Sequence, residues 1–237
     1  LFAGSNAGGS YDPVTGTSEY NVFLGQNSGT CIANGDGNIA IGLAAGCRVS
    51  TGSCNIFMGY YSGGGFANNT GDHNIVMGMN AAFSMNSGGC NIILGRMAGS
   101  QVSGGSQNIF IGKDSGCGGG SKSGLDNISL GTKSGVTLTS GNANVSIGKC
   151  SGGATTGSNN IFLGQNTGSS ATSADANIVM GCCAASGVLT GGCNIALGVV
   201  AGKCLTSGYQ NVFIGRQAGQ YSTTCHDNVF IGDNTGK

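Results

Sequence analysis

The side chains best suited to acid–base or metal chemistry are few and lie far apart in the sequence. The two histidines, His73 and His226, each stand beside an aspartate, Asp72 and Asp227. A His–Asp pair can be part of a metal site or of a nucleophile-activating set, but either site needs further groups that converge on it. The two pairs are nine repeats apart, so solvated turn residues are their expected role. The sequence therefore predicts no catalytic, cofactor-binding or metal-binding residue.

Other aspartates occur at the same place in the repeat described below, one or two residues before a recurring Asn. A calcium-binding row would need a denser Gly-Gly-x-Gly-x-Asp pattern. Asp is a favoured turn residue, so turn formation explains the placement better. The residues are Asp36, Asp72, Asp126, Asp175 and Asp227.

The chain has eleven cysteines, and thiol chemistry is the next alternative. Cys31 and Cys47 fall on adjacent repeats at nearly the same corner, so the geometry permits a disulfide between them. Most of the others have no Cys in the same column of the next repeat, and no Cys-x-x-Cys pair has zinc-ligand spacing. Cys is also a small apolar filler, so mainly free thiols are expected.

Composition narrows the class of protein. Of 237 residues, 49 are Gly and one is Pro, 39% are hydrophobic, and nine basic side chains balance nine acidic ones. Collagen needs abundant Pro, and disordered chains are poorer in apolar residues. The charge balance excludes a basic nucleic-acid surface, and no apolar run is long enough to insert as a membrane helix. So much glycine must be ordered by a repeating backbone.

One short motif recurs along almost the whole chain: Asn, Ile or Val, any residue, Ile, Leu or Met, then Gly. The Asn returns at every seventeenth residue in most copies; counting it as position 0, position 4 is always Gly, and position 8 is Gly except at Ala82 and Ala185. Stacked Asn side chains at one corner are expected to form an amide ladder. The ladder residues are Asn21, Asn38, Asn55, Asn74, Asn91, Asn108, Asn127, Asn144, Asn160, Asn177, Asn194, Asn211 and Asn228.

The period predicts an all-β fold, a β-solenoid (β-roll) of about thirteen 17-residue turns. Two-helix repeats need about 33 residues and propeller blades about 40. Residues 1–20 form a partial first turn with a longer loop, and residues 21–237 form the tandem repeats. Because neither end carries a polar cap, we expect a segment of a longer array.

Strand alternation places positions 1 and 3 on one face and position 2 on the other. Positions 1 and 3 are always aliphatic, which predicts the solenoid core, with a third core column near position 11 that includes Ile32, Val49 and Val188. Position 2 is often Phe, which predicts a second buried face. The simplest cover for that face is two more copies of the chain around a three-fold axis; another protein or domain is the alternative. The predicted oligomer seam comprises Phe23, Phe57, Phe110, Phe162, Phe213 and Phe230.

The motifs Asn-Val-Phe-Ile-Gly-Arg-Gln-Ala-Gly (211–219) and Asn-Ile-Phe-Leu-Gly-Gln-Asn-Thr-Gly (160–168) resemble repeats of tail-fibre-like proteins of marine cyanobacterial myoviruses. The Asn-x-x-Ile-Gly-x-x-Ala core is similar, more loosely, to the head repeats of trimeric autotransporter adhesins, which have a shorter period and form a trimeric β-roll. The resemblance covers essentially all of residues 1–237 and implies no catalytic residue.

The expected function is structural: a rigid fibre shaft of a virion, a homotrimer at the virion surface or outside the cell, without enzymatic activity. A host cell-surface receptor would be contacted by the long loops Tyr61–Thr70 and Cys117–Ser123. A bacterial adhesin or extracellular filament is the alternative. An ice-binding solenoid is a weaker one, because Thr and Ser recur beside turn glycines rather than on a strand.

Overall fold

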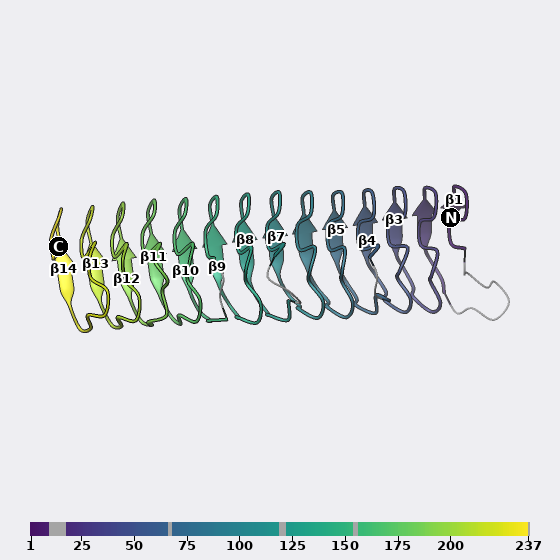
Figure 1. Ribbon diagram of the computed structural model, residues 1–237. Coiled ribbons are helices and arrows are strands. Elements are labelled where there is room, and N and C mark those ends of the chain that lie inside the picture. Colours follow the sequence, from purple (N-terminus) through teal and green to yellow (C-terminus); the bar gives the residue numbers. More distant parts are fainter. Residues whose placement is uncertain (10–17, 66–67, 119–121, 154–155, 237) are drawn as a thin grey trace. The chain divides into compact units, whose positions relative to one another are not determined.

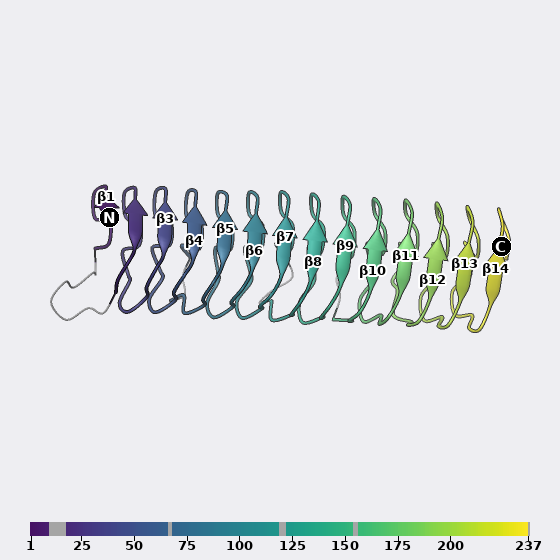
Figure 2. The same cartoon turned by 180° about the vertical axis from the view of Figure 1, so that it is seen from behind.

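The computed structural model describes residues 1–9, 18–65, 68–118, 122–153 and 156–236. Within these ranges the protein is all-β, with fourteen short strands arranged as a β-solenoid of about thirteen turns and no helix. The chain divides into two compact units, Leu1–Ser123 and Gly124–Lys237. In each unit the strands follow one another in chain order, with a narrow corner after each strand (Figures 1 and 2). The predicted fold class is thereby confirmed.

Each unit contributes seven strands. The strands of the first unit are β1 (Phe2–Ala3), β2 (Val22–Leu24), β3 (Ile39–Ile41), β4 (Ile56–Met58), β5 (Ile75–Met77), β6 (Ile92–Leu94) and β7 (Ile109–Ile111). Those of the second unit are β8 (Ile128–Leu130), β9 (Val145–Ile147), β10 (Ile161–Leu163), β11 (Ile178–Met180), β12 (Ile195–Leu197), β13 (Val212–Ile214) and β14 (Val229–Ile231).

Neighbouring strands are parallel and pair residues that occupy the same position of the repeat. Ile39 is opposite Ile56, and Phe57 is opposite Val76 although the turn between them is longer than the turns around it. The extra residues of that turn are therefore absorbed outside the strand. This constant register is what allows one side-chain column to run through many turns.

The structure corrects the prediction of which strand face is inside. Position 2 points into the solenoid: Phe23, Phe57, Phe110, Phe162 and Phe213 are at most 1% exposed within the single chain. Phe230, in the last described turn, is partly buried and packs against the same core. The Phe residues are therefore core residues and not an oligomer seam, while positions 1 and 3 point outward.

Side chains alternate along a strand, so either position 2 or positions 1 and 3 can point inward, and a turn this short has room only for the single side chain at position 2. Space for it comes from the small residue at position 7 and from Gly at position 8. A Cβ on Gly29 would lie 2.6 Å from the Phe23 ring. Where consecutive turns both carry Phe, the rings stack, as between Phe213 and Phe230 with centroids 5.3 Å apart.

The column near position 11 is the second inward column, with one shift from the predicted residues. Ile32 and Val49 are buried as predicted, but Val188 is 55% exposed and its neighbour Leu189 is fully buried instead. The Leu189 N–H donates to the carbonyl of Gly187 at 2.8 Å. This tight local turn rotates Val188 outward and Leu189 inward.

The glycine columns serve two different needs. Gly95, at position 4, has φ 135°, and a Cβ there would lie 2.5 Å from the carbonyl oxygen of Gly112 on the next turn. Gly52, at position 14, lacks a positive φ but approaches the carbonyl of Gly71 equally closely. Left-handed backbone also occurs without Gly, mainly at positions 6 and 16, as at Tyr61 with φ 51°.

Candidate functional site

The recurring Asn side chains form a buried hydrogen-bonded ladder in each unit. Asn55 shows the pattern: its backbone N–H donates to Oδ1 of Asn38 at 3.0 Å, and its Nδ2 donates to the same oxygen at 3.1 Å. The same Nδ2 donates to the carbonyl of Gly71, in its own turn, at 2.9 Å. Each amide therefore joins one turn to the previous one and also closes its own turn.

The ladder is a structural device, and its buried amides are engaged within it rather than presented to a ligand. Asn55, Asn74 and Asn91 are fully buried, and the same bonds join Asn144 to Asn127 at the start of the second unit. Buried polar groups with all their partners present fix a unique register, because a one-residue slip would leave several of them unsatisfied.

Each unit presents an apolar outer strand face, which we define as the side chains at positions 1 and 3 of the repeat. Most are half-buried, and Ile75, Met77 and Ile111 in the first unit are 37–39% exposed. The two columns hold only Ile, Val, Leu and Met in the complete repeats. A continuous aliphatic surface of this kind marks an interaction face more often than a solvated one.

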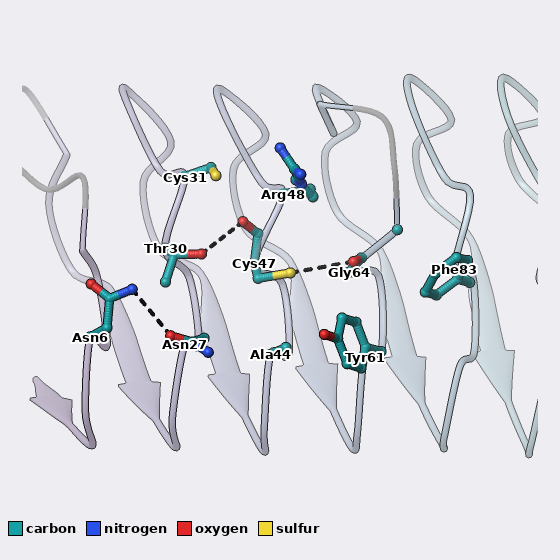
Figure 3. A pocket seen from close by; sticks show the side chains of 11 residues that line it. Asn6, Asn27, Thr30, Cys31, Ala44, Cys47, Arg48, Tyr61, Gly64 and Phe83 are labelled. Atoms are coloured by element: carbon teal, nitrogen blue, oxygen red, sulfur yellow. Dashed lines mark hydrogen bonds between the residues drawn. The ribbon is translucent and has the colours of Figure 1, made fainter.

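A hollow of about 440 Å³ lies on the first unit, beside the start of the first long loop. Four successive turns and the partial first turn contribute to it (Figure 3). Asn6 and Asn27 lie at one end, with the Asn6 Nδ2 donating to the Asn27 Oδ1 at 3.1 Å. Tyr61 and Phe83 lie at the other end, with their ring centroids 6.1 Å apart.

The hollow exists because small residues interrupt columns that are otherwise bulky. Ala44 occupies the same corner position as Asn27 before it and Tyr61 after it. Cys47 and Gly64 form the neighbouring part of the lining. The central turns are therefore recessed between an amide end and an aromatic end.

The predicted receptor loops lie partly outside the described residues. Residues 66–67 of the loop Tyr61–Thr70 and residues 119–121 of the loop Cys117–Ser123 are not described, nor are residues 10–17 of the partial first turn. Tyr61, Gly64 and Gly65 of the first loop line the hollow. The sequence did not predict the contribution of the preceding turns, although Ala44 between Asn27 and Tyr61 is a readable signal for it.

The cysteines of the structure are free thiols, and no disulfide joins Cys31 to Cys47. The Cys47 Sγ instead donates to the carbonyl of Gly64 at 3.3 Å, and burial raises the pKa of the Cys47 thiol. Cys182 and Cys183 are neighbours on one corner with their sulfurs 3.4 Å apart, and the hydrogen bond between them raises the pKa of Cys182.

The His and Asp residues do not converge on a site within the described ranges. His226 Nδ1 lies 2.9 Å from Asp227 Oδ2, and both side chains are exposed. The His226 ring stacks on Tyr209 with centroids 4.9 Å apart. No group of three His, Cys, Asp or Glu side chains that could hold a metal ion occurs among the residues described.

Lys122 is a charged residue that the structure places unexpectedly, since its side chain is buried and the residue is only 2% exposed. The backbone N–H of Lys122 donates a hydrogen bond to the Gln101 carbonyl at 3.0 Å, and the Lys122 carbonyl accepts one from the Gly105 N–H at 3.0 Å. Burial lowers the pKa of Lys122 from its ordinary 10.5 to about 8.

This lysine gives the first unit a specific pH dependence. Below pH 8 Lys122 is charged in both folded and unfolded chains, and the full cost of burying the charge is present. Above pH 10.5 it is neutral in both. Between these values Lys122 is neutral in the folded chain but still protonated in the unfolded chain, so the free energy of unfolding rises with pH, by about 3 kcal/mol in total. We expect Lys122→Met to be more stable than wild type near neutral pH, with a difference that shrinks by about 3 kcal/mol by about pH 10.5.

Urea unfolding of both proteins at several pH values measures this difference. The cysteine thiols are common to both proteins, so any contribution they make to the pH dependence cancels in the comparison. A difference in the free energy of unfolding that stays constant from neutral to alkaline pH would contradict the assignment.

Comparison of the chain with protein family models, curated proteins and solved structures finds no match. Among the residues described, no helix has the length and apolar character needed to cross a membrane. The surface of the chain offers two candidate functional features: the outer strand face and the hollow beside Tyr61.

Proposed function

We propose that this chain is a structural segment of a virion fibre shaft, located at the virion surface or outside the cell, and that it works without catalysis as a homotrimer. The observation that carries the proposal is the outer strand face, a continuous aliphatic surface on turns that are locked in register by the buried Asn ladder. Within each unit the stacked turns resist bending because neighbouring strands and neighbouring ladder amides are hydrogen-bonded to one another.

The outer strand face replaces the Phe residues as the surface for assembly. In the first unit about a dozen aliphatic side chains, each exposing on the order of 50 Å², give a patch on the order of 600 Å², close to the ~800 Å² that each partner buries in a stable interface. A second copy of the chain has the same rise per turn, so every turn meets an equivalent turn. The resemblance to trimeric adhesin heads favours three copies around the axis.

The shaft proposal also fits the absence of Thr from the outward-facing strand positions. An ice-binding surface needs a flat strand face of Thr, and the strand positions that face outward here are aliphatic. In the proposed role the shaft projects an attachment surface toward a host cell-surface receptor, and side chains outside the strands make that contact.

Light scattering on the purified chain tests the assembly. We expect three times the chain mass for wild type and the single-chain mass for Ile56→Lys/Ile92→Lys, which places charges on the outer strand face of β4 and β6. Gln26→Lys, at an exposed corner position, is the matched control and should remain a trimer. Circular dichroism confirms that the variants keep their strands. A wild type that is monomeric at micromolar concentration rules out the assembly, and a stable dimer rules out the three-fold arrangement.

A further inference from the structure

The hollow beside Tyr61 combines three features that recognise one class of ligand. It has a flat aromatic end, an amide end and a cation at its rim, arranged over successive turns of the first unit (Figure 3). Its lining residues lie in the corners and loops between the strands, not at the strand positions that the proposed trimer covers. The site therefore stays open in the assembled shaft.

The aromatic end is held in place before any ligand arrives. Tyr61 is half-buried, and its ring packs edge-on against Tyr60 with centroids 4.7 Å apart and against Phe83 at 6.1 Å. Aromatic side chains that are already ordered offer contact area at small entropic cost. A flat apolar ring face suits the C–H face of a pyranose, which combines an apolar face with polar hydroxyl edges.

The amide end supplies groups that match hydroxyls. The Asn27 side chain uses its Oδ1 to accept from Asn6, which leaves the Nδ2 donor for a ligand. Amides carry both donors and an acceptor, as sugar hydroxyls do. Thr30 is also in the lining, with its Oγ1 donating to the Cys47 carbonyl at 3.1 Å, so its position is fixed.

Arg48 supplies the charge at the rim. It is exposed and forms no salt bridge with an acidic side chain in the described parts of the chain. No Asp or Glu is among the described residues that line the hollow. A guanidinium recognises a carboxylate by two parallel hydrogen bonds, which a neutral sugar cannot offer.

We propose that the hollow binds an acidic saccharide, with a sugar ring against Tyr61, hydroxyls on the Asn27 amide and a carboxylate on Arg48. The proposal rests on the attachment part of the proposed function for its biological setting, and it names the chemistry of the surface that the shaft meets. The sugar lies along the stack, because the lining residues succeed one another from turn to turn.

The probe is the trisaccharide of α-1,4-linked galacturonic acid, with the neutral galactose trisaccharide of the same linkage as its control. Calorimetry or saturation-transfer NMR on the whole chain measures both. We expect saturable millimolar binding of the acidic sugar and at least about tenfold weaker binding of the neutral one, a change that corresponds to about 1.4 kcal/mol.

Two variants locate the site. Tyr61→Ala is expected to fold, because Ala44 occupies the same corner position with φ 54° against 51° at Tyr61. Arg48→Gln removes only the charge at the rim. Each should weaken binding of the acidic sugar at least about tenfold, while Tyr221→Ala and Arg96→Gln, at exposed sites outside the hollow, should bind as wild type does.

The proposal is overturned if the acidic sugar does not bind, if the neutral sugar binds equally well, or if the two variants bind like wild type. These outcomes are separate from the mass measurement. A trimer that binds no sugar contradicts the saccharide site but not the shaft proposal. A monomer that binds the sugar contradicts the trimer but not the saccharide site.

Discussion

Asn74→Ala is expected to lower the free energy of unfolding of the first unit by about 3 to 5 kcal/mol, because several buried partners lose their bonds at once. The Asn74 Oδ1 accepts from the backbone N–H and from Nδ2 of Asn91 at 2.9 and 3.0 Å. The Asn74 Nδ2 donates to the Gly88 carbonyl at 2.9 Å. An alanine leaves a buried N–H and a buried carbonyl without partners.

Urea unfolding followed by circular dichroism measures the loss. Asn86→Ala is the matched control, because the Asn86 side chain is exposed. The hydrogen bond from the Asn86 backbone N–H to the Ser103 carbonyl, at 3.1 Å, is kept in the variant. A change below about 0.5 kcal/mol is expected there. If Asn74→Ala costs no more than the control, the ladder does not stabilise the stack.

Phe57→Ala is expected to cost about 3 to 5 kcal/mol, as is usual for removing a fully buried ring. Phe57 is 0% exposed, and its neighbours in the same column are Ala40 and Val76, too small to fill the space. Ile56→Ala, one residue away on the outer strand face, should cost about 1 kcal/mol in the monomer because its side chain is only half-buried.

The pair of variants separates the inside from the outside of the strand. The loss at Phe57 should be independent of protein concentration, whereas the loss at Ile56 should grow with concentration as assembly contributes. The opposite order, with Ile56→Ala the more damaging at every concentration, would restore the originally predicted orientation of the strand.

The repeat itself could be predicted from the sequence because its causes are local. The 17-residue period, the strand after each Asn and the glycine corners follow from residues that recur at fixed positions. Alternation could not predict which face of the strand is inside, because both faces are apolar and the more constant residues, at positions 1 and 3, are the ones that point outward.

The side-chain volumes at positions 2 and 8 are correlated, and this correlation indicates which face of the strand is inside. The two turns with Ala instead of Gly at position 8, Ala82 and Ala185, are turns with Val76 and Val179 at position 2, and all four side chains are fully buried. Where position 2 is Phe, a Cβ at position 8 would strike its ring, as at Gly168, 2.3 Å from the Phe162 ring. Compensating volumes indicate that both positions share one interior.

The hollow beside Tyr61 was less predictable than the fold, for a different reason. Its lining residues are far apart in sequence, from Asn6 to Phe83, and they meet only because the turns stack in register. Tyr61, Gly64 and Gly65 of the loop Tyr61–Thr70 line one end of the hollow. The recess at Ala44 and Cys47 depends on which residues are small in consecutive turns, and it becomes visible only when the repeats are aligned in columns.

The polarity of the Asn ladder has a consequence for how the chain folds during synthesis. Within each unit the ladder Asn residues donate to the oxygen of the Asn one turn earlier, as Asn38 does to Asn21 and Asn55 to Asn38. A ribosome releases the earlier turn first, so the acceptor is already in place when the next donor emerges. The turns can thus fold one at a time from the N-terminus toward the C-terminus, and each folded turn is the template for the next one.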